Sequence, residues 1–123
     1  MKITNVNYSN DSSGASIAVK RINQMLLKNE FDSVILSFLK SKSKNKFEIA
    51  LRTFAHKILQ KIQQNIFGIK VPHSTNFGFI SSNFYKTINN KNSEIVNLHW
   101  IGNEMMSLKD ISKLKGFLIW TLH

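Results

Sequence analysis

The chain has 123 residues, enough for one domain and too few for two. With 42% hydrophobic and 20% charged residues, it is predicted to fold rather than to be disordered. It has no cysteine, which excludes disulfides and thiolate metal sites, and it has no apolar run of the roughly 20 residues that cross a bilayer. The N-terminus lacks the apolar core of a signal peptide, so we expect a cytoplasmic protein.

The charge is strongly positive. The chain has seventeen Lys and Arg but only seven Asp and Glu, which gives a formal net charge of +10. Such a balance favours anionic partners: nucleic acid, phosphates or an acidic membrane surface. Aromatic residues do not alternate with basic ones as in a platform for single-stranded nucleic acid, so a nucleic-acid partner rests on net charge alone. The alternative, that the lysines only reflect an AT-rich genome, stays open.

The first forty residues predict a βαβ unit. Residues 3–8 are β-prone and alternate apolar with polar side chains, and a polar turn ending on Gly14 follows. A helix is expected from about Ala15 to the sequence KNE, and residues 33–39 form a short apolar run typical of a second strand. The two strands should be parallel, with a right-handed crossover. The predicted inner face of the helix is Ala15, Ala18, Val19, Ile22, Met25 and Leu26.

The middle of the chain predicts one long amphipathic helix. It runs over residues 46–67, after a lysine–serine loop, and Arg52, His56, Lys57 and Lys61 lie off its apolar stripe. Two interpretations stay open: the helix packs on the sheet, or it lies on an anionic membrane leaflet. Residues 68–93 show no clear period and predict loops with a short helix near 83–88. The stripe consists of Phe47, Leu51, Phe54, Ile58, Ile62 and Ile66.

A second βαβ unit is predicted at the end. Residues 95–100 and 117–122 are apolar runs of the kind found in strands that are covered on both faces. Ser107–Asp110 has the pattern of a capping box that opens a short helix, and Gly116 occupies the expected C-cap. Leu108, Ile111 and Leu114 form the expected inner face of that helix. The fold class is therefore α/β, with a parallel sheet and flanking helices.

Two groups of residues are candidates for chemistry. Ser13, Gly14 and Ala15 form a small-residue turn before a helix, where backbone amides can approach a phosphate. One glycine is far short of the dinucleotide fingerprint, so a plain turn with an unusual backbone angle at Gly14 stays open. His99 and His123 each follow a predicted strand at its carboxyl end, beside the expected ligand crevice, although each could merely cap its strand.

Other patterns are less informative. No role is expected for His56, on a basic helix face, or for His73, in a loop. The scattered acidic residues offer no paired carboxylates, and no serine–histidine arrangement stands out.

Two stretches resemble the N-terminal part of glycosyltransferase family 4 enzymes that build bacterial surface polysaccharides. SSGASIAVKRINQMLLKN is similar to the helix that follows their first strand. SEIVNLHWIGNEMMSLKDISKLKGFLIWTLH is similar, over about thirty residues, to a later segment ending in T-L-H. The resemblance covers both ends of the chain and leaves the middle unconstrained. The chain departs from the family with SG in place of the usual double glycine, and with Gly116 in place of proline before the last strand.

The resemblance implies a fold and a function. Residues 1–123 would be an incomplete, acceptor-side N-terminal domain of a GT-B fold, with a partial Rossmann-like sheet and without the C-terminal donor-binding domain. The intact enzyme would transfer a sugar, without a metal, from a nucleotide-sugar to a saccharide or lipid-linked acceptor. Ser13, Gly14 and Ala15 would approach the donor diphosphate, and His99 and His123 would face the acceptor or the transferred sugar. The fragment alone is not expected to catalyse the reaction.

Two other classes of function remain open. One is a small basic binding protein for nucleic acid or for an anionic membrane surface. The other is a non-catalytic interaction domain on the same α/β scaffold.

Overall fold

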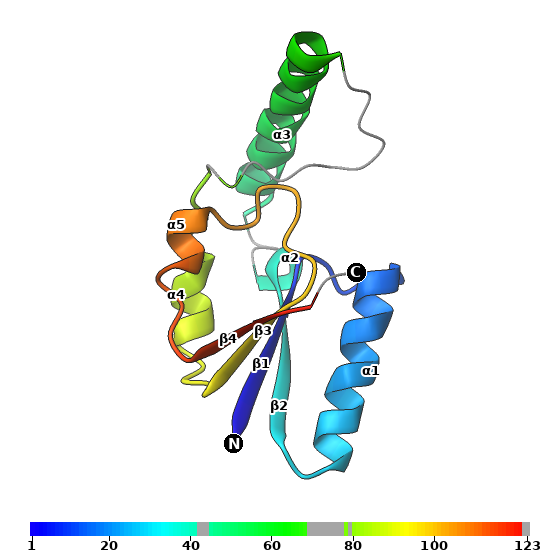
Figure 1. The fold of residues 1–123 in the computed structure, drawn as a ribbon, viewed down its shortest axis with the longest axis vertical. Helices are drawn as coiled ribbons and strands as arrows, with labels where there is room; N and C mark the ends of the chain where they lie inside the picture. The colour runs from blue at the N-terminus through cyan, green and yellow to red at the C-terminus, as the bar shows by residue number, and fades with distance from the viewer. Residues whose placement is uncertain (42–44, 69–77, 79, 122–123) are drawn as a thin grey trace.

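The computed structural model describes residues 1–41, 45–68, 78 and 80–121. Its four strands form one parallel sheet in the order β2-β1-β3-β4, which confirms the predicted α/β class with a partial Rossmann-like sheet (Figure 1). The elements are β1 (Lys2–Asn7), α1 (Gly14–Lys28), β2 (Asp32–Ser37), α2 (Phe38–Ser41), α3 (Lys46–Phe67), α4 (Phe84–Asn89), β3 (Ile95–Leu98), α5 (Leu108–Ile111) and β4 (Phe117–Trp120).

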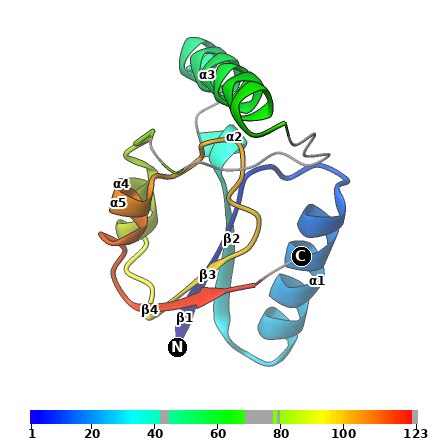
Figure 2. The ribbon, with the colours of Figure 1, turned by 45° about the horizontal axis from the view of Figure 1, so that its top comes forward.

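Helices lie on both faces of the sheet. Helix α1 covers one face, and α4 and α5 cover the other (Figure 2). Helix α3 extends beyond the carboxyl ends of the strands, away from the sheet (Figures 1 and 2). Because all four strands are parallel, the loops that follow β1, β2 and β3 meet at the carboxyl edge of the sheet.

The face under α4 and α5 carries the apolar core. Phe38 stacks on Tyr8 and meets Phe84 edge to face, with ring centroids 5.8 and 5.2 Å apart. Phe84 and Ile88 bring α4 onto this face, where Val6 and Leu98 of the two central strands are fully buried. The buried core is Val6, Phe38, Phe84, Ile88, Val96, Leu98, Ile101, Met105 and Met106.

The face under α1 is unusually polar. Asn5 and Asn97 are paired in register on β1 and β3, and the Asn97 amide donates to Asn5 Oδ1 at 3.3 Å. Asn5 Nδ2 in turn donates to Ser33 Oγ at 3.1 Å, and Ser33 donates to Asn23 Oδ1 of α1 at 2.8 Å. Helix α1 is thus attached to the sheet partly by a buried hydrogen-bonded network, which fixes its position more specifically than apolar packing alone.

The predicted bounds of the helices were close to those observed, whereas several strands were predicted too long. The strand expected over residues 33–39 ends at Ser37, because Phe38 turns into the core and begins α2. The strand expected over 95–100 ends at Leu98, and β4 ends at Trp120. Helix α3 has the predicted bounds, and α4 lies within one residue of its prediction.

The apolar stripe of α3 does not pack on the sheet, which was one of the two placements that the sequence left open. Its apolar stripe is exposed: Phe47, Leu51, Phe54, Ile58, Ile62 and Ile66 are between 43% and 78% accessible. Arg52 and His56 lie off the stripe, as predicted, and are buried. The reason is Arg52, whose guanidinium donates to the carbonyl oxygens of Ser81 at 2.6 Å and of Glu104 at 3.1 Å. We call the six exposed residues the α3 stripe.

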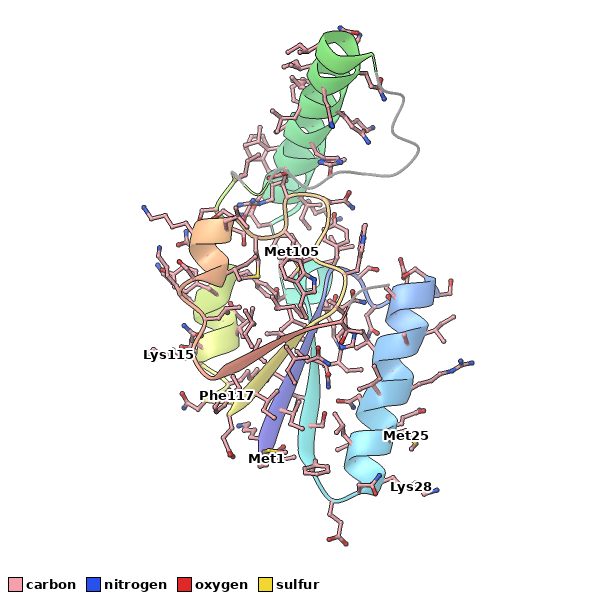
Figure 3. All side chains as sticks on the ribbon, viewed as in Figure 1. Met1, Met25, Lys28, Met105, Lys115 and Phe117 are labelled. Carbon is pink, nitrogen blue, oxygen red and sulfur yellow. The ribbon has the colours of Figure 1, made fainter. Side chains whose placement is uncertain are left out.

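Two residues of the predicted apolar helix faces are exposed. Met25 is 61% exposed, on the side of α1 away from the sheet (Figure 3), and Leu108 is 68% exposed. The capping box is confirmed: Ser107 Oγ accepts from the Asp110 amide, and Asp110 Oδ2 accepts from the Ser107 amide. Gly116 is not the helix cap, because α5 ends at Ile111 and Ser112 is its C-cap. Its φ of +94° and a Cβ that would lie 2.7 Å from Ser93 O require glycine there.

Candidate functional site

The strand order creates a switch point between β1 and β3. The chain leaves β1 toward β2 on one side and leaves β3 toward β4 on the other. In parallel α/β sheets, the two diverging connections leave a crevice just outside the carboxyl ends of such strands, and ligands bind there. The backbone closes this edge through two hydrogen bonds, from His99 N to Val6 O at 2.9 Å and from Tyr8 N to Trp100 O at 3.0 Å.

A pocket of about 430 Å³ lies at this switch point. It is lined from the loops that follow three of the strands: the β1–α1 loop, the start of α2 and the segment after β3. We call it the switch-point pocket. Its lining residues are Tyr8, Ser9, Asp11, Ser13, Ala15, Leu39, Trp100 and Asn103.

One wall of the switch-point pocket is aromatic. The Tyr8 and Trp100 rings meet edge to face with centroids 5.4 Å apart, and Tyr8 is backed by Phe38 of the core. Burial raises the pKa of the Tyr8 phenol, an effect that its hydrogen bond with Asn103 partly offsets. The phenol therefore stays neutral, so this wall offers ring faces and edges, a hydroxyl and an amide.

The other wall is a network of hydroxyls around one carboxylate. Asp11 Oδ1 accepts from the Ser13 amide at 2.9 Å and from Ser16 Oγ at 3.0 Å. Hydrogen bonds from the Ser13 hydroxyl and amide, with smaller contributions from Ser16 and Ser9, hold the pKa of Asp11 far below its ordinary value, although slight desolvation opposes them. The pocket therefore carries a fixed negative charge at neutral pH.

The predicted turn of Ser13, Gly14 and Ala15 lies at this pocket. Ser13 and Ala15 line it, and Gly14 begins α1. The first bond of the helix runs from Ile17 N to Ser13 O, so helix geometry leaves the amides of Gly14 and Ala15 open. The unusual backbone angle considered for Gly14 is absent, because its φ lies outside the left-handed region. A Cβ at Gly14 would meet nothing within 4 Å, so folding does not require glycine at this position.

His99 lies at the carboxyl edge of the sheet, as predicted, but its side chain is buried inside the protein. It is 1% exposed, and its Nε2 lies 3.3 Å from Asn5 Oδ1 on the polar face under α1. It holds the strand ends together beneath the pocket and does not line it. His123 and His73 lie outside the described residues. His56 is buried, and neither of its ring nitrogens has a hydrogen-bond partner in the part of the chain that the structure describes.

Sequence reasoning missed most of the pocket. Tyr8, Asp11, Trp100 and Asn103 were not singled out. Their signal was positional, since each follows a strand whose carboxyl end belongs to the ligand edge. It could not be used before the strand order was known, because the order decides which loops become neighbours.

Two negative findings bear on the kind of site. Within the described ranges, no three His, Asp or Glu side chains gather as metal ligands, and no helix there is long and apolar enough to cross a membrane. The chain matches no protein-family model, no curated protein and no solved structure.

Proposed function

We propose that the chain is the acceptor-side, N-terminal part of a glycosyltransferase and that a saccharide binds in the switch-point pocket. The observation that carries the proposal is this pocket, at the crevice of a parallel sheet, lined by both aromatic and hydrogen-bonding side chains. The sequence resemblance to glycosyltransferase family 4 supports the same function.

The lining suits a hydroxyl-rich ligand. The faces of sugar rings carry C–H groups that pack on aromatic rings, and Tyr8 and Trp100 offer such rings. Sugar hydroxyls donate and accept hydrogen bonds, and Asp11, Asn103 and Ser9 offer partners of both kinds. The volume of about 430 Å³ lies in the range of small-ligand pockets.

We propose that the nucleotide-sugar donor makes few of its contacts with this chain. Open amides at Gly14 and Ala15 could approach a diphosphate, but the ionised Asp11 shares the pocket and repels one. In the family that the chain resembles, a second domain holds the nucleotide-sugar. We therefore propose that this chain by itself binds the acceptor saccharide. It would bind nucleotide-sugar only together with such a domain. Transfer of the sugar would likewise require that domain.

Trp100 gives a direct test. The chain has two tryptophans, so the Trp120→Phe background leaves Trp100 as the reporter in the pocket. Neutral mono- and disaccharides should change its fluorescence saturably, and nucleotide-sugars should do so only at much higher concentration. Asn103→Ala should raise the saccharide Kd about tenfold, which corresponds to a loss of about 1.4 kcal/mol in binding free energy. Asn65→Ala, an exposed asparagine on α3, is the matched control. A saccharide response that Asn103→Ala leaves intact, or no response at all, would refute the proposal.

The same chain tests the nucleic-acid alternative. A basic nucleic-acid binder should hold a DNA duplex or single strand with an affinity that falls steeply with salt. Tight, salt-sensitive DNA binding without any saccharide response would favour that alternative.

We also propose peripheral attachment to the cytoplasmic face of an anionic membrane. The net charge of +10 favours such a surface, and a lipid-linked acceptor would be found there.

A further inference from the structure

Helix α3 presents an apolar surface that nothing in the described structure covers. The α3 stripe runs along a helix of 22 residues, about 33 Å long, and Phe47, Ile66 and Phe54 are 78%, 67% and 63% exposed. A continuous apolar face of this extent is typical of an interaction surface. Figure 3 shows the helix α3 with its side chains standing clear of the body of the protein along most of its length.

The charges around the stripe are positive. At about 100° per residue, Lys46, Lys57 and Lys61 fall along one border of the stripe, and all three are exposed. The helix carries a single acid, Glu48, whose Oε1 accepts from Arg52 Nη2 at 3.1 Å. That carboxylate is thus engaged with the inward side of the helix. The exposed charges on the outward side are therefore ammonium groups, beside the apolar stripe and the neutral side chains of Thr53, Gln64 and Asn65.

We infer that the α3 stripe inserts into an anionic lipid bilayer, with α3 lying in the interfacial plane. This rests on the proposed peripheral attachment and names the surface that makes it. Phe and Ile side chains would enter the boundary between head groups and acyl chains, to a depth of about 5–10 Å. Lys57 and Lys61 would keep their ammonium groups among the lipid phosphates by extending their stems along the apolar face.

The spacing of the stripe argues against a second copy as the occupant. The six residues from Phe47 to Ile66 cover 19 positions in five steps, about 3.8 residues per step. A left-handed coiled coil needs about 3.5 residues per step, so the stripe would turn away from a partner helix within a few turns. A bilayer is indifferent to register and complements the lysine border in charge.

The position of α3 relates this surface to the pocket. Helix α3 extends from the carboxyl edge of the sheet, the edge that carries the switch-point pocket (Figures 1 and 2). Arg52 fastens the helix to this edge through the carbonyl oxygens of Ser81 and Glu104. Binding through the stripe therefore holds the pocket's edge near the lipid surface, where the head group of a lipid-linked saccharide lies.

Vesicle co-sedimentation of the full chain tests the inference. Vesicles of phosphatidylcholine alone and with phosphatidylglycerol are compared, in dilute protein and at increasing salt. The wild type should prefer the anionic vesicles and lose affinity with salt. The Phe54→Ser, Ile58→Ser double variant should lose at least tenfold in vesicle affinity while its circular dichroism stays unchanged, because both residues are exposed. The Lys57→Gln, Lys61→Gln double variant should lose the preference for anionic lipid.

The matched control removes equal apolar exposure elsewhere. Met25 and Leu27 are 61% and 52% exposed on α1, so Met25→Ser with Leu27→Ser should bind vesicles like the wild type. A second readout is insertion: a tryptophan replacing Phe54 should shift its emission to the blue on vesicles, and one replacing Thr53, off the stripe, should not.

Three results would overturn the inference. They are equal binding to neutral and anionic vesicles, retained binding by the stripe variant, and a stripe variant that only converts a dimer to a monomer. None of them bears on saccharide binding by Trp100 fluorescence, so failure here is distinguishable from failure of the proposed enzyme function.

Discussion

At the scale of single residues, Gly14 separates the needs of the fold from those of a ligand. Its φ is one that any residue adopts, and a Cβ would meet nothing within 4 Å. Gly116 is the opposite case, since its φ of +94° and the nearby Ser93 carbonyl leave no room for a side chain. A requirement for glycine at position 14 would therefore come from what approaches α1.

Gly14→Ala should accordingly leave stability unchanged or raise it by about 0.5 kcal/mol, because alanine reduces the freedom of the unfolded chain. Urea unfolding followed by circular dichroism measures this. The matched Gly116→Ala should lose about 2 kcal/mol or more, from strain and the contact with Ser93. If Gly14→Ala destabilised the fold as much, the open space at α1 would be refuted.

Asp110 makes part of the stability depend on pH. Burial raises the pKa of its carboxyl, but hydrogen bonds from Ser81, Ser82 and Ser107 outweigh that effect and leave the pKa below its ordinary value of 3.8. A lowered folded-state pKa adds stability above pH 3.8, which is lost as the pH falls through the folded value. The free energy of unfolding should thus decline below about pH 4.

Asp110→Asn should lower stability at neutral pH by about 1–3 kcal/mol, since three donors lose an ionised acceptor, and it should flatten the decline in acid. Thermal unfolding between pH 2 and 7 measures both effects. Asp11→Asn serves as a comparison outside the capping box. An acid decline of unchanged steepness in Asp110→Asn would show that other carboxyls cause it.

At the scale of secondary-structure elements, Arg52 decides how α3 attaches. Its guanidinium donates to Ser81 O, Glu104 O and Glu48 Oε1, and it is 8% exposed. Arg52→Met should therefore cost about 3–5 kcal/mol, the penalty for breaking a buried charged network. Arg52→Lys should recover little, because an ammonium cannot reproduce the planar fork.

Hydrogen exchange locates the effect of these variants. Protection should fall first in α3 and near residues 80–81, while the amides of β1 and β3 stay protected. Lys57→Met, on the exposed side of the same helix, is the control and should change little. Uniform loss of protection over the whole chain would contradict a local attachment.

The sequence predicted the elements better than their faces. Hydrophobic periodicity placed α3 with its exact bounds, because spacing alone determines a helix. The same pattern could not show which face is buried, since the inward face depends on carbonyl groups at residues 81 and 104 that only the fold brings to Arg52. For the same reason the Ser13–Ala15 turn and the position of His99 at the edge were predictable, and the pairing of Asp11 with Trp100 in one pocket was not.

At the scale of the whole molecule, the sheet is covered unevenly. Strand β4 pairs with β3 on one side only, and its side chains are exposed on both faces, with Phe117 at 81% and Trp120 at 50%. The strand was expected to be apolar because helices cover it, and it is apolar without such cover in the described structure. An unpaired apolar edge is a template for another strand.

We therefore expect the isolated chain to associate through β4 as its concentration rises. The amides of Phe117 and Thr121 donate to Glu94 O and Leu98 O, each at 2.8 Å, so by strand alternation the amide of Leu118 points to the open edge. Leu118→Pro should suppress association with little loss of stability, because proline is tolerated where a strand amide faces outward.

Ile119→Pro is the matched control, since the amide of Ile119 faces β3 by the same alternation and its loss should unfold the edge. Analytical ultracentrifugation over a range of concentrations, with and without the Phe54→Ser, Ile58→Ser change, separates association through β4 from association through the α3 stripe. A wild-type chain that stays monomeric at every concentration, with one cooperative thermal transition, would show that the β4 edge is not adhesive. In that case the solvated edge would be stable by itself. The candidate reason would be the polar network of Asn5, Asn97 and Thr121, which reaches the residue after β4 through a 2.9 Å hydrogen bond.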